Sequence, residues 1–161
     1  MILQMNITYD IEKYNKKNIF FLETKQNMLM DGKFTKLLFS DNIFTTIGIF
    51  LNIQFNSSSI CQINKKCILR FDKNDINMKI INNLANIERT ILQYYKNLNN
   101  CNKEVNYLLY NTLMNGSIKL YVKQYNNLSN LKYIIKISGV WENDKEVGIT
   151  YKFLEINDLY Q

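Results

Sequence analysis

Hydrophobic and polar residues alternate in the C-terminal third of the chain, and the alternation predicts three successive strands. Their sequences are SIKLYVKQY, LKYIIKISGVW and VGITYKFLEI. Side chains of a strand point alternately to the two faces of a sheet, so Ile118, Leu120 and Val122 should share one face. The opposite face of the same strand carries cations and aromatic rings in turn: Lys119, Tyr121, Lys123 and Tyr125. We therefore expect one face that packs into a core and one that combines lysines with tyrosines.

The N-terminal half of the chain also has the period of strands. LQMNITY and NIFFLET predict two short strands that form an arm within residues 1–30, and KFTKLLFS follows the turn signal Asp31-Gly32. In the next run, IFTTIGIFLNIQF, alternation assigns these side chains to the buried face: Ile47, Ile49, Leu51, Ile53 and Phe55. Gly48 inside this run predicts a bend, a bulge or the close approach of another backbone.

A basic hairpin and a helical segment complete the middle of the chain. SICQINKKCILRFD predicts a hairpin or one interrupted strand, with Lys65 and Lys66 at its tip. From Asp75 the apolar residues take helical spacing: Ile76, Ile80, Leu84, Ile87, Ile91, Tyr94 and Leu98. Asp72, Asn74 or Asp75 can cap this helix. KEVNYLLYNTLMNG predicts a second helix, which Gly116 ends.

The order of these elements predicts the fold class: mostly β with a helical insert, an α+β arrangement in a single domain over residues 1–161. Strands fill residues 33–71, the helical insert fills 75–115, and closing strands fill 117–156. An OB-like antiparallel barrel with one or two helices between its third and fourth core strands has this order. An open antiparallel sheet packed on two helices fits the order as well.

The charge of the chain favours an anionic partner. The 161 residues carry a net charge of +6, and the pI is about 9.1. Such a balance suits nucleic acid, an acidic protein surface or anionic lipid. The abundance of Asn, Ile and Lys is typical of an AT-rich genome, so part of the lysine content carries no functional meaning.

The residues that most often carry catalysis or bind metal are scarce. The chain has no histidine, and its three cysteines, Cys61, Cys67 and Cys101, form no C-x-x-C pair. We therefore expect no metal, no cofactor and no enzymatic activity. The chain shows no signal-peptide pattern and no apolar run that could span a bilayer. We expect a soluble, intracellular protein that does not contact a membrane.

The closing segment IIKISGVWENDKEVGITYKFLEI resembles the last hairpin of single-stranded DNA-binding proteins of the T7-phage type, which have relatives in large DNA viruses of eukaryotes. The resemblance rests on Trp141, the polar turn 142–146 and Val147-Gly148. DGKFTKLLFSDNIFTTIGIFLNIQF also resembles the opening of short proteins in large AT-rich DNA viruses. The resemblance implies a viral protein of DNA replication or repair, in the host cytoplasm or at a viral replication site. The ending LEINDLYQ departs from the acidic, partner-recruiting tail of the phage-type family.

Two functional hypotheses follow. The first is sequence-tolerant binding of single-stranded DNA, or of RNA, through the face of lysines and tyrosines. The expected phosphate contacts are Lys119, Lys123, Lys132 and Lys136, with Lys65 and Lys66 adding a loop contact. The expected base-stacking residues are Tyr121, Tyr125, Phe50 and Trp141, although Trp141 could equally be a core residue. The second hypothesis is a viral structural or assembly protein, or a small protein-interaction module, without nucleic-acid binding. Either protein could form a homo-oligomer.

Overall fold

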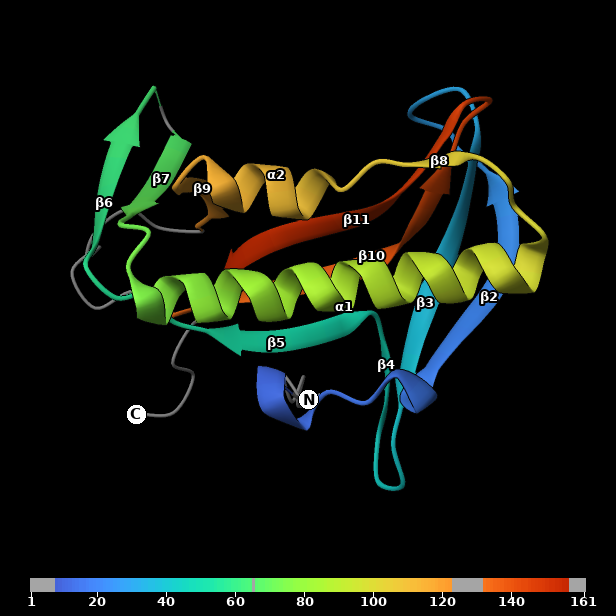
Figure 1. Ribbon diagram of the computed structural model, residues 1–161, viewed down its shortest axis with the longest axis horizontal. Coiled ribbons are helices and arrows are strands. Elements are labelled where there is room, and N and C mark those ends of the chain that lie inside the picture. The colour runs from blue at the N-terminus through green and yellow to red at the C-terminus, as the bar shows by residue number, and fades with distance from the viewer. Residues whose placement is uncertain (1–7, 65, 123–131, 157–161) are drawn as a thin grey trace, which may run out of the picture.

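The computed structural model describes residues 8–64, 66–122 and 132–156 (Figure 1). The strands are β1 (Tyr9–Asp10), β2 (Ile19–Gln26), β3 (Lys33–Ser40), β4 (Thr45–Ile47), β5 (Ile49–Ile53), β6 (Ser58–Ile63), β7 (Lys66–Phe71), β8 (Glu104–Val105), β9 (Ser117–Tyr121), β10 (Tyr133–Glu142) and β11 (Glu146–Glu155). The helices are α1 (Asp75–Asn99) and α2 (Leu108–Met114), with short 3-10 turns η1 (Ile11–Lys13) and η2 (Lys16–Asn18). The predicted α+β class is confirmed.

The sheet is mixed and open, so the expected antiparallel barrel is not confirmed. Its main strand order is β1-β5-β10-β11-β9-β7-β6, and β3 joins it through β10 and carries β2 and β4. Three of the pairings are parallel: β1 with β5, β11 with β8 and β11 with β9. The sheet packs against α1 instead of closing on itself. A helix of 25 residues is about 38 Å long, and α1 runs along one side of the sheet (Figure 1).

β10 is the strand at which the sheet forks. Its first half pairs with β5 and its second half with β3, while its other edge follows β11 throughout. A register shift between Ile137 and Gly139 separates the two halves. A side chain at Gly139 would place Cβ 2.2 Å from the carbonyl oxygen of Thr35. Glycine therefore allows β3 to approach β10 at the fork.

Gly48 joins β4 to β5 and confirms the predicted close approach of another backbone. Its φ is +96°, and a Cβ there would lie 2.8 Å from the carbonyl oxygen of Ile137. The positive φ interrupts the alternation of side chains. Ile47 was expected on the buried face, but it is 60% exposed, whereas Ile49 is fully buried. The assignment of Ile47 was wrong because it assumed that side chains alternate without interruption on both sides of Gly48.

α1 has the predicted bounds, but its buried side is rotated from the predicted stripe. The side chain of Asn74 accepts a hydrogen bond from the Asn77 amide at the start, and Asn100 takes a left-handed conformation after the end. The buried residues are Asn77, Ile81, Leu84, Ala85, Ile87, Glu88, Ile91, Leu92 and Tyr95. Ile76 and Leu98 belong to the predicted stripe but are exposed. The buried side includes three polar side chains with partners inside the fold, which a hydrophobic period cannot reveal.

The segment predicted as one second helix is a strand followed by a shorter helix. Glu104 and Val105 form β8 and pair with β11, so α2 begins only at Leu108. Glu88 of α1 fixes that start, because its carboxylate accepts the amides of Leu109 and Tyr110 at 3.0 Å each. Burial raises the pKa of Glu88 although both hydrogen bonds lower it. Gly116 follows the end of α2 at positive φ, as predicted.

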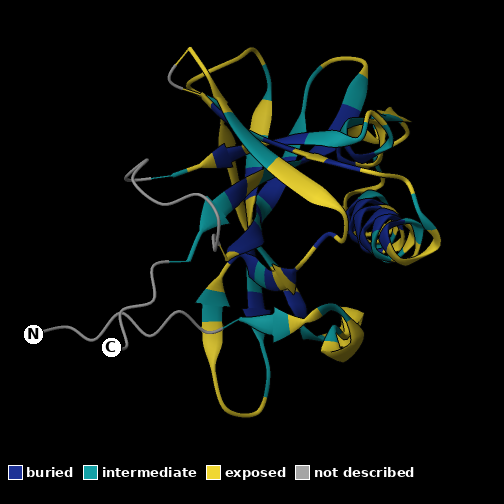
Figure 2. Cartoon of the chain, turned by 90° about the vertical axis from the view of Figure 1, so that its left-hand side faces the viewer, coloured by how far each residue is buried: buried dark blue, intermediate teal, exposed yellow. Residues whose placement is uncertain are grey.

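Both helices lie on the same side of the sheet, in contact with β11 and with each other (Figure 1). Leu51, Ile135 and Ile149 point to this inner face and are buried in the core. Figure 2 views α1 along its axis, with its buried side toward the strands and its exposed side away from them. The other side of the sheet is here termed the outer face. In the described parts of the chain, no helix combines the length and apolarity needed to cross a membrane.

Candidate nucleic-acid interface

Three lysines lie side by side across three neighbouring strands of the outer face. Lys136 of β10 pairs with Lys152 of β11. The parallel register of β11 and β9 then places Lys119 beside Lys152. On the far side of β10, Phe50 of β5 pairs with Lys136. Neighbouring strands are about 4.8 Å apart, so the three lysines span roughly 10 Å. Lys136, Lys152 and Lys119 are termed the lysine row, and Phe50 lies at its β5 end.

Aromatic rings lie at both ends of the lysine row. The Nζ atoms of Lys119 and Lys152 lie 4.7 and 5.1 Å from the ring centroid of Tyr121. Nζ of Lys136 lies 5.2 Å from the ring centroid of Phe50. These are cation–π distances. Tyr121 is 44% exposed, so its ring remains accessible to a ligand.

The lysine row is not explained by the stability of the fold. Like charges directly opposite each other on neighbouring strands destabilise a sheet, and Lys136 and Lys152 are such a pair. Among the residues that the structure describes, no salt bridge joins Lys119, Lys136 or Lys152 to a carboxylate. An anionic ligand would neutralise this repulsion.

Trp141 lies on the same outer face and is half-buried. It pairs with Gly148, and a Cβ at Gly148 would come within 2.5 Å of the indole ring. Its Nε1–H donates a hydrogen bond of 3.2 Å to the carbonyl oxygen of Ile149. The indole ring therefore lies against the backbone of β11, where the absence of a side chain at Gly148 leaves room for it. It is neither a free surface side chain nor a core residue.

The structure places several other predicted residues near this face. Lys66 opens β7 and lies beside Tyr121 by register, because Cys67 pairs with Leu120. Lys132 immediately precedes β10 and is exposed. Three predicted residues lie outside the described parts of the chain: Lys65, Lys123 and Tyr125. In the part of the arm that the structure describes, β1 pairs with β5, and Tyr14 stacks on Phe39 of the core.

Sequence reasoning missed Lys152, which occupies the centre of the lysine row. Counting back from the turn after β10 without a bulge would set Lys152 opposite Ile137. The register shift at Gly139 instead brings Lys136 opposite Lys152. The alternation of its strand puts Lys152 on the outer face. Its partner across β10 could not be predicted, because the sequence pattern does not reveal the bulge.

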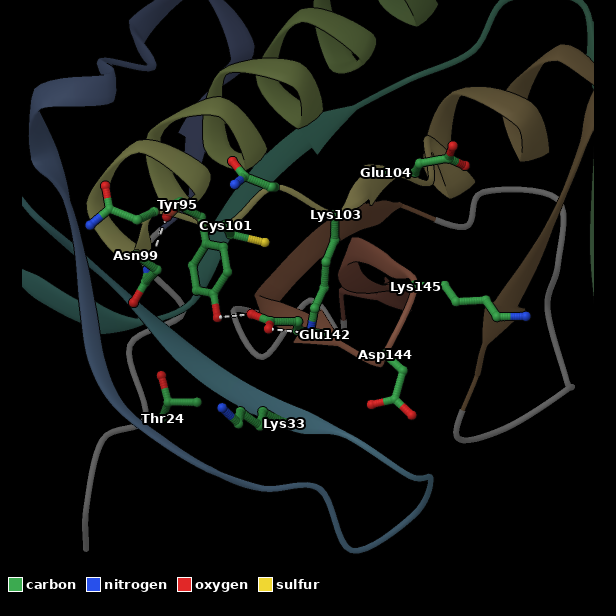
Figure 3. Close-up of a pocket in the computed structure, with 12 residues that line it drawn as sticks. Thr24, Lys33, Tyr95, Asn99, Cys101, Lys103, Glu104, Glu142, Asp144 and Lys145 are labelled. Atoms are coloured by element: carbon green, nitrogen blue, oxygen red, sulfur yellow. Dashed lines mark hydrogen bonds and ion pairs between the residues drawn. The ribbon is translucent and has the colours of Figure 1, made fainter.

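A polar cleft of about 950 Å³ lies at the C-terminal end of α1 (Figure 3). Glu142 is its central side chain. Lys103 Nζ lies 2.6 Å from one carboxylate oxygen of Glu142, and the Tyr95 hydroxyl donates to the other at 3.0 Å. Figure 3 shows both side chains pointing at Glu142, while Lys145 extends away from it.

The carboxylate of Glu142 is held by two partners from other parts of the chain. Its burial would raise its pKa, but the hydrogen bonds from Lys103 and Tyr95 outweigh burial and hold the pKa below its ordinary value. Both oxygens are thus committed to protein partners. Cys101 also lines the cleft, yet no group of three or more metal-binding side chains occurs in the described residues.

Comparisons with protein-family models, with curated proteins and with solved structures find no match to this chain. The resemblance to single-stranded DNA-binding proteins of the T7-phage type stays a prediction. A functional proposal therefore rests on the geometry of the outer face.

Proposed function

We propose that this protein binds single-stranded DNA, or RNA, without strong sequence preference, through the outer face of its sheet. The lysine row is the observation that carries the proposal. Sheet register sets Lys136, Lys152 and Lys119 side by side, with the rings of Phe50 and Tyr121 at the two ends. Ammonium groups would bind phosphates, and the rings would stack on bases.

Binding across a strand face is also how OB folds hold oligonucleotides, so the proposal does not need a closed barrel. The protein would be a binding protein and not an enzyme, in keeping with the commitment of Glu142 to Lys103 and Tyr95. A role in viral DNA replication or repair, in the host cytoplasm or at a replication site, is the part of the proposal that rests on the resemblance alone.

The test is a titration of fluorescently labelled oligo-dT, followed by anisotropy at several salt concentrations. Three phosphate contacts to a single strand predict a slope of about −2 in a plot of log K against log salt. Lys119→Gln should weaken binding and flatten this slope. Lys79→Gln is the matched control, because Lys79 is an exposed lysine on α1, across the sheet from the lysine row. Affinity that stays flat with salt, or equal losses in both variants, would overturn the proposal.

A second candidate is a protein-interaction module, and one surface favours it. Phe20, Leu38 and Ile47 lie in register across β2, β3 and β4. Phe20 is 52% exposed and Ile47 is 60% exposed. Apolar side chains that gather on a surface mark sites of protein contact. A stable oligomer that Ile47→Lys dissociates, together with absent oligonucleotide binding, would favour this candidate over the first.

A further inference from the structure

One edge of β11 has an open stretch. β8 pairs with β11 at Glu146 and Val147, and β9 pairs with it at Phe153 and Leu154. Between Val147 and Phe153, no strand of the described chain pairs with this edge. The two flanking strands close the gap at both ends, which leaves a short window in the sheet.

A hollow of about 310 Å³ lies at this window. Its lining includes the rings of Tyr121, Trp141 and Tyr151 and the side chain of Leu108. Lys119 and Lys152 also line it, so the hollow adjoins the lysine row. Its size is at the lower end of the range of about 300–1,000 Å³ for pockets that hold small ligands.

Two of the aromatic side chains around the window already have hydrogen-bond partners. Trp141 Nε1–H donates to the carbonyl oxygen of Ile149. The Tyr151 hydroxyl bonds to Thr112 Oγ1 at 2.8 Å. These bonds hold both rings in fixed positions at the hollow.

The backbone of β11 supplies a further donor and acceptor at this edge. The carbonyls of Val147 and Ile149 point to the open edge, where Asn106 and Trp141 bond them. Backbone groups point to the same edge at every second residue, so the N–H and C=O of Tyr151 also point there. In the described chain, no ladder partner pairs with Tyr151 on this side.

We infer that this hollow receives one nucleobase of the bound strand. A base is flat and aromatic and carries a donor beside an acceptor on one edge, which suits the rings and the Tyr151 backbone. A strand held by Lys119 and Lys152 would present its bases to the hollow. The inference rests on the proposed function and adds one position at which the base matters. An extended peptide fits less well, because β8 and β9 leave only a short length of free edge.

The test compares oligonucleotides that carry a single base in an otherwise abasic strand. Removal of that base should weaken binding at least fivefold, the lower bound for stacking of one base. Leu108→Phe should fill the hollow and abolish this difference while binding to the fully abasic strand is retained. Leu98→Phe is the matched control, since Leu98 is an exposed leucine on α1. In amide NMR spectra of the wild type, the base-bearing strand should shift the Tyr151 amide.

The outcomes separate the two proposals. Salt-dependent binding with no effect of the single base overturns the base site and leaves the proposed function standing. Binding to no strand at all overturns both. A Tyr151 amide that an extended apolar peptide shifts, and that oligonucleotides leave unchanged, makes the window a peptide site and overturns the base site.

Discussion

At the scale of single residues, Glu142 connects three parts of the chain that lie far apart in sequence. It stands at the end of β10, accepts a hydrogen bond from the Tyr95 hydroxyl of α1 and forms an ion pair with Lys103, which precedes β8. The Tyr95 hydroxyl also accepts a hydrogen bond from Thr35 of β3 at 3.4 Å. One partly buried carboxylate thus ties the end of the long helix to the end of β10.

This arrangement predicts a loss of stability in acid. The pKa of Glu142 is lowered in the fold, so its contribution is present above the pKa of an unfolded glutamate and is lost as pH falls through the folded pKa. We expect Glu142→Gln to lower the free energy of unfolding by about 1–3 kcal/mol near neutral pH, and by less in acid. Urea denaturation at about pH 7 and about pH 3 measures both.

Glu104→Gln is the control for that experiment, because Glu104 is exposed and lines the same cleft. It should change stability little at either pH. If Glu142→Gln and wild type lose stability equally between the two pH values, the ion pair does not act as described.

At the scale of elements, the outer face of the sheet combines binding capacity with electrostatic strain. Lys136 and Lys152 oppose each other on β10 and β11 without a carboxylate partner among the described residues. Residues that weaken a sheet yet suit a ligand are the expected signature of a functional surface.

Lys152→Gln should therefore separate binding from stability. Removal of one phosphate contact predicts a reduction of about 0.7 in the salt slope of single-strand binding. Relief of the repulsion predicts unchanged or slightly higher stability, within about 1 kcal/mol. Fluorescence anisotropy measures the salt slope and urea denaturation measures the stability, both on the same preparation of the Lys152→Gln variant. A variant that loses stability and affinity together would mean that Lys152 acts through folding.

The fork at β10 makes a different prediction. Gly139→Ala would place Cβ 2.2 Å from a backbone oxygen of β3, so β3 must separate from β10. We expect destabilisation by more than about 2 kcal/mol, in the range reserved for strained or overpacked sites. Ser138→Ala, at the neighbouring position, should cost much less. Thermal unfolding of both variants gives the comparison, and equal melting temperatures would contradict the role assigned to Gly139.

The same elements show how far sequence patterns reach. Alternation in β9 correctly separated buried Ile118 and Leu120 from exposed Lys119 and Tyr121. The bounds of α1 followed from caps and spacing. Alternation failed for Ile47, and the opposition of Lys136 and Lys152 was missed, because one glycine and one bulge change the phase of a strand. Such phase changes depend on a neighbouring backbone that is remote in sequence, and a local pattern does not contain it.

At the scale of the whole molecule, the two sides of the sheet have different roles. α1 and α2 occupy the inner face, and the outer face carries the lysine row and Trp141. The outer face is therefore the surface on which a long anionic polymer can lie without displacing a helix.

The fluorescence of Trp141 can report whether a ligand binds to the outer face, because Trp141 is the only tryptophan in the chain. Single-stranded DNA bound to the outer face should quench its fluorescence and protect it from acrylamide. A partner bound to the exposed side of α1 should do neither. Stern–Volmer constants measured with and without oligo-dT provide the test, and unchanged constants at saturating oligo-dT would place the strand elsewhere.

The central position of β10 also has a consequence for folding during synthesis on the ribosome. The Phe55 amide donates to the Tyr133 hydroxyl across a sequence separation of 78 residues. β3 and β5 are synthesised long before the strand that joins them, so the edges that pair with β10 lack that partner until the closing segment emerges. Contacts of such separation slow folding and leave intermediates prone to aggregation. In a growing chain, the sheet can therefore be completed only after translation passes β10.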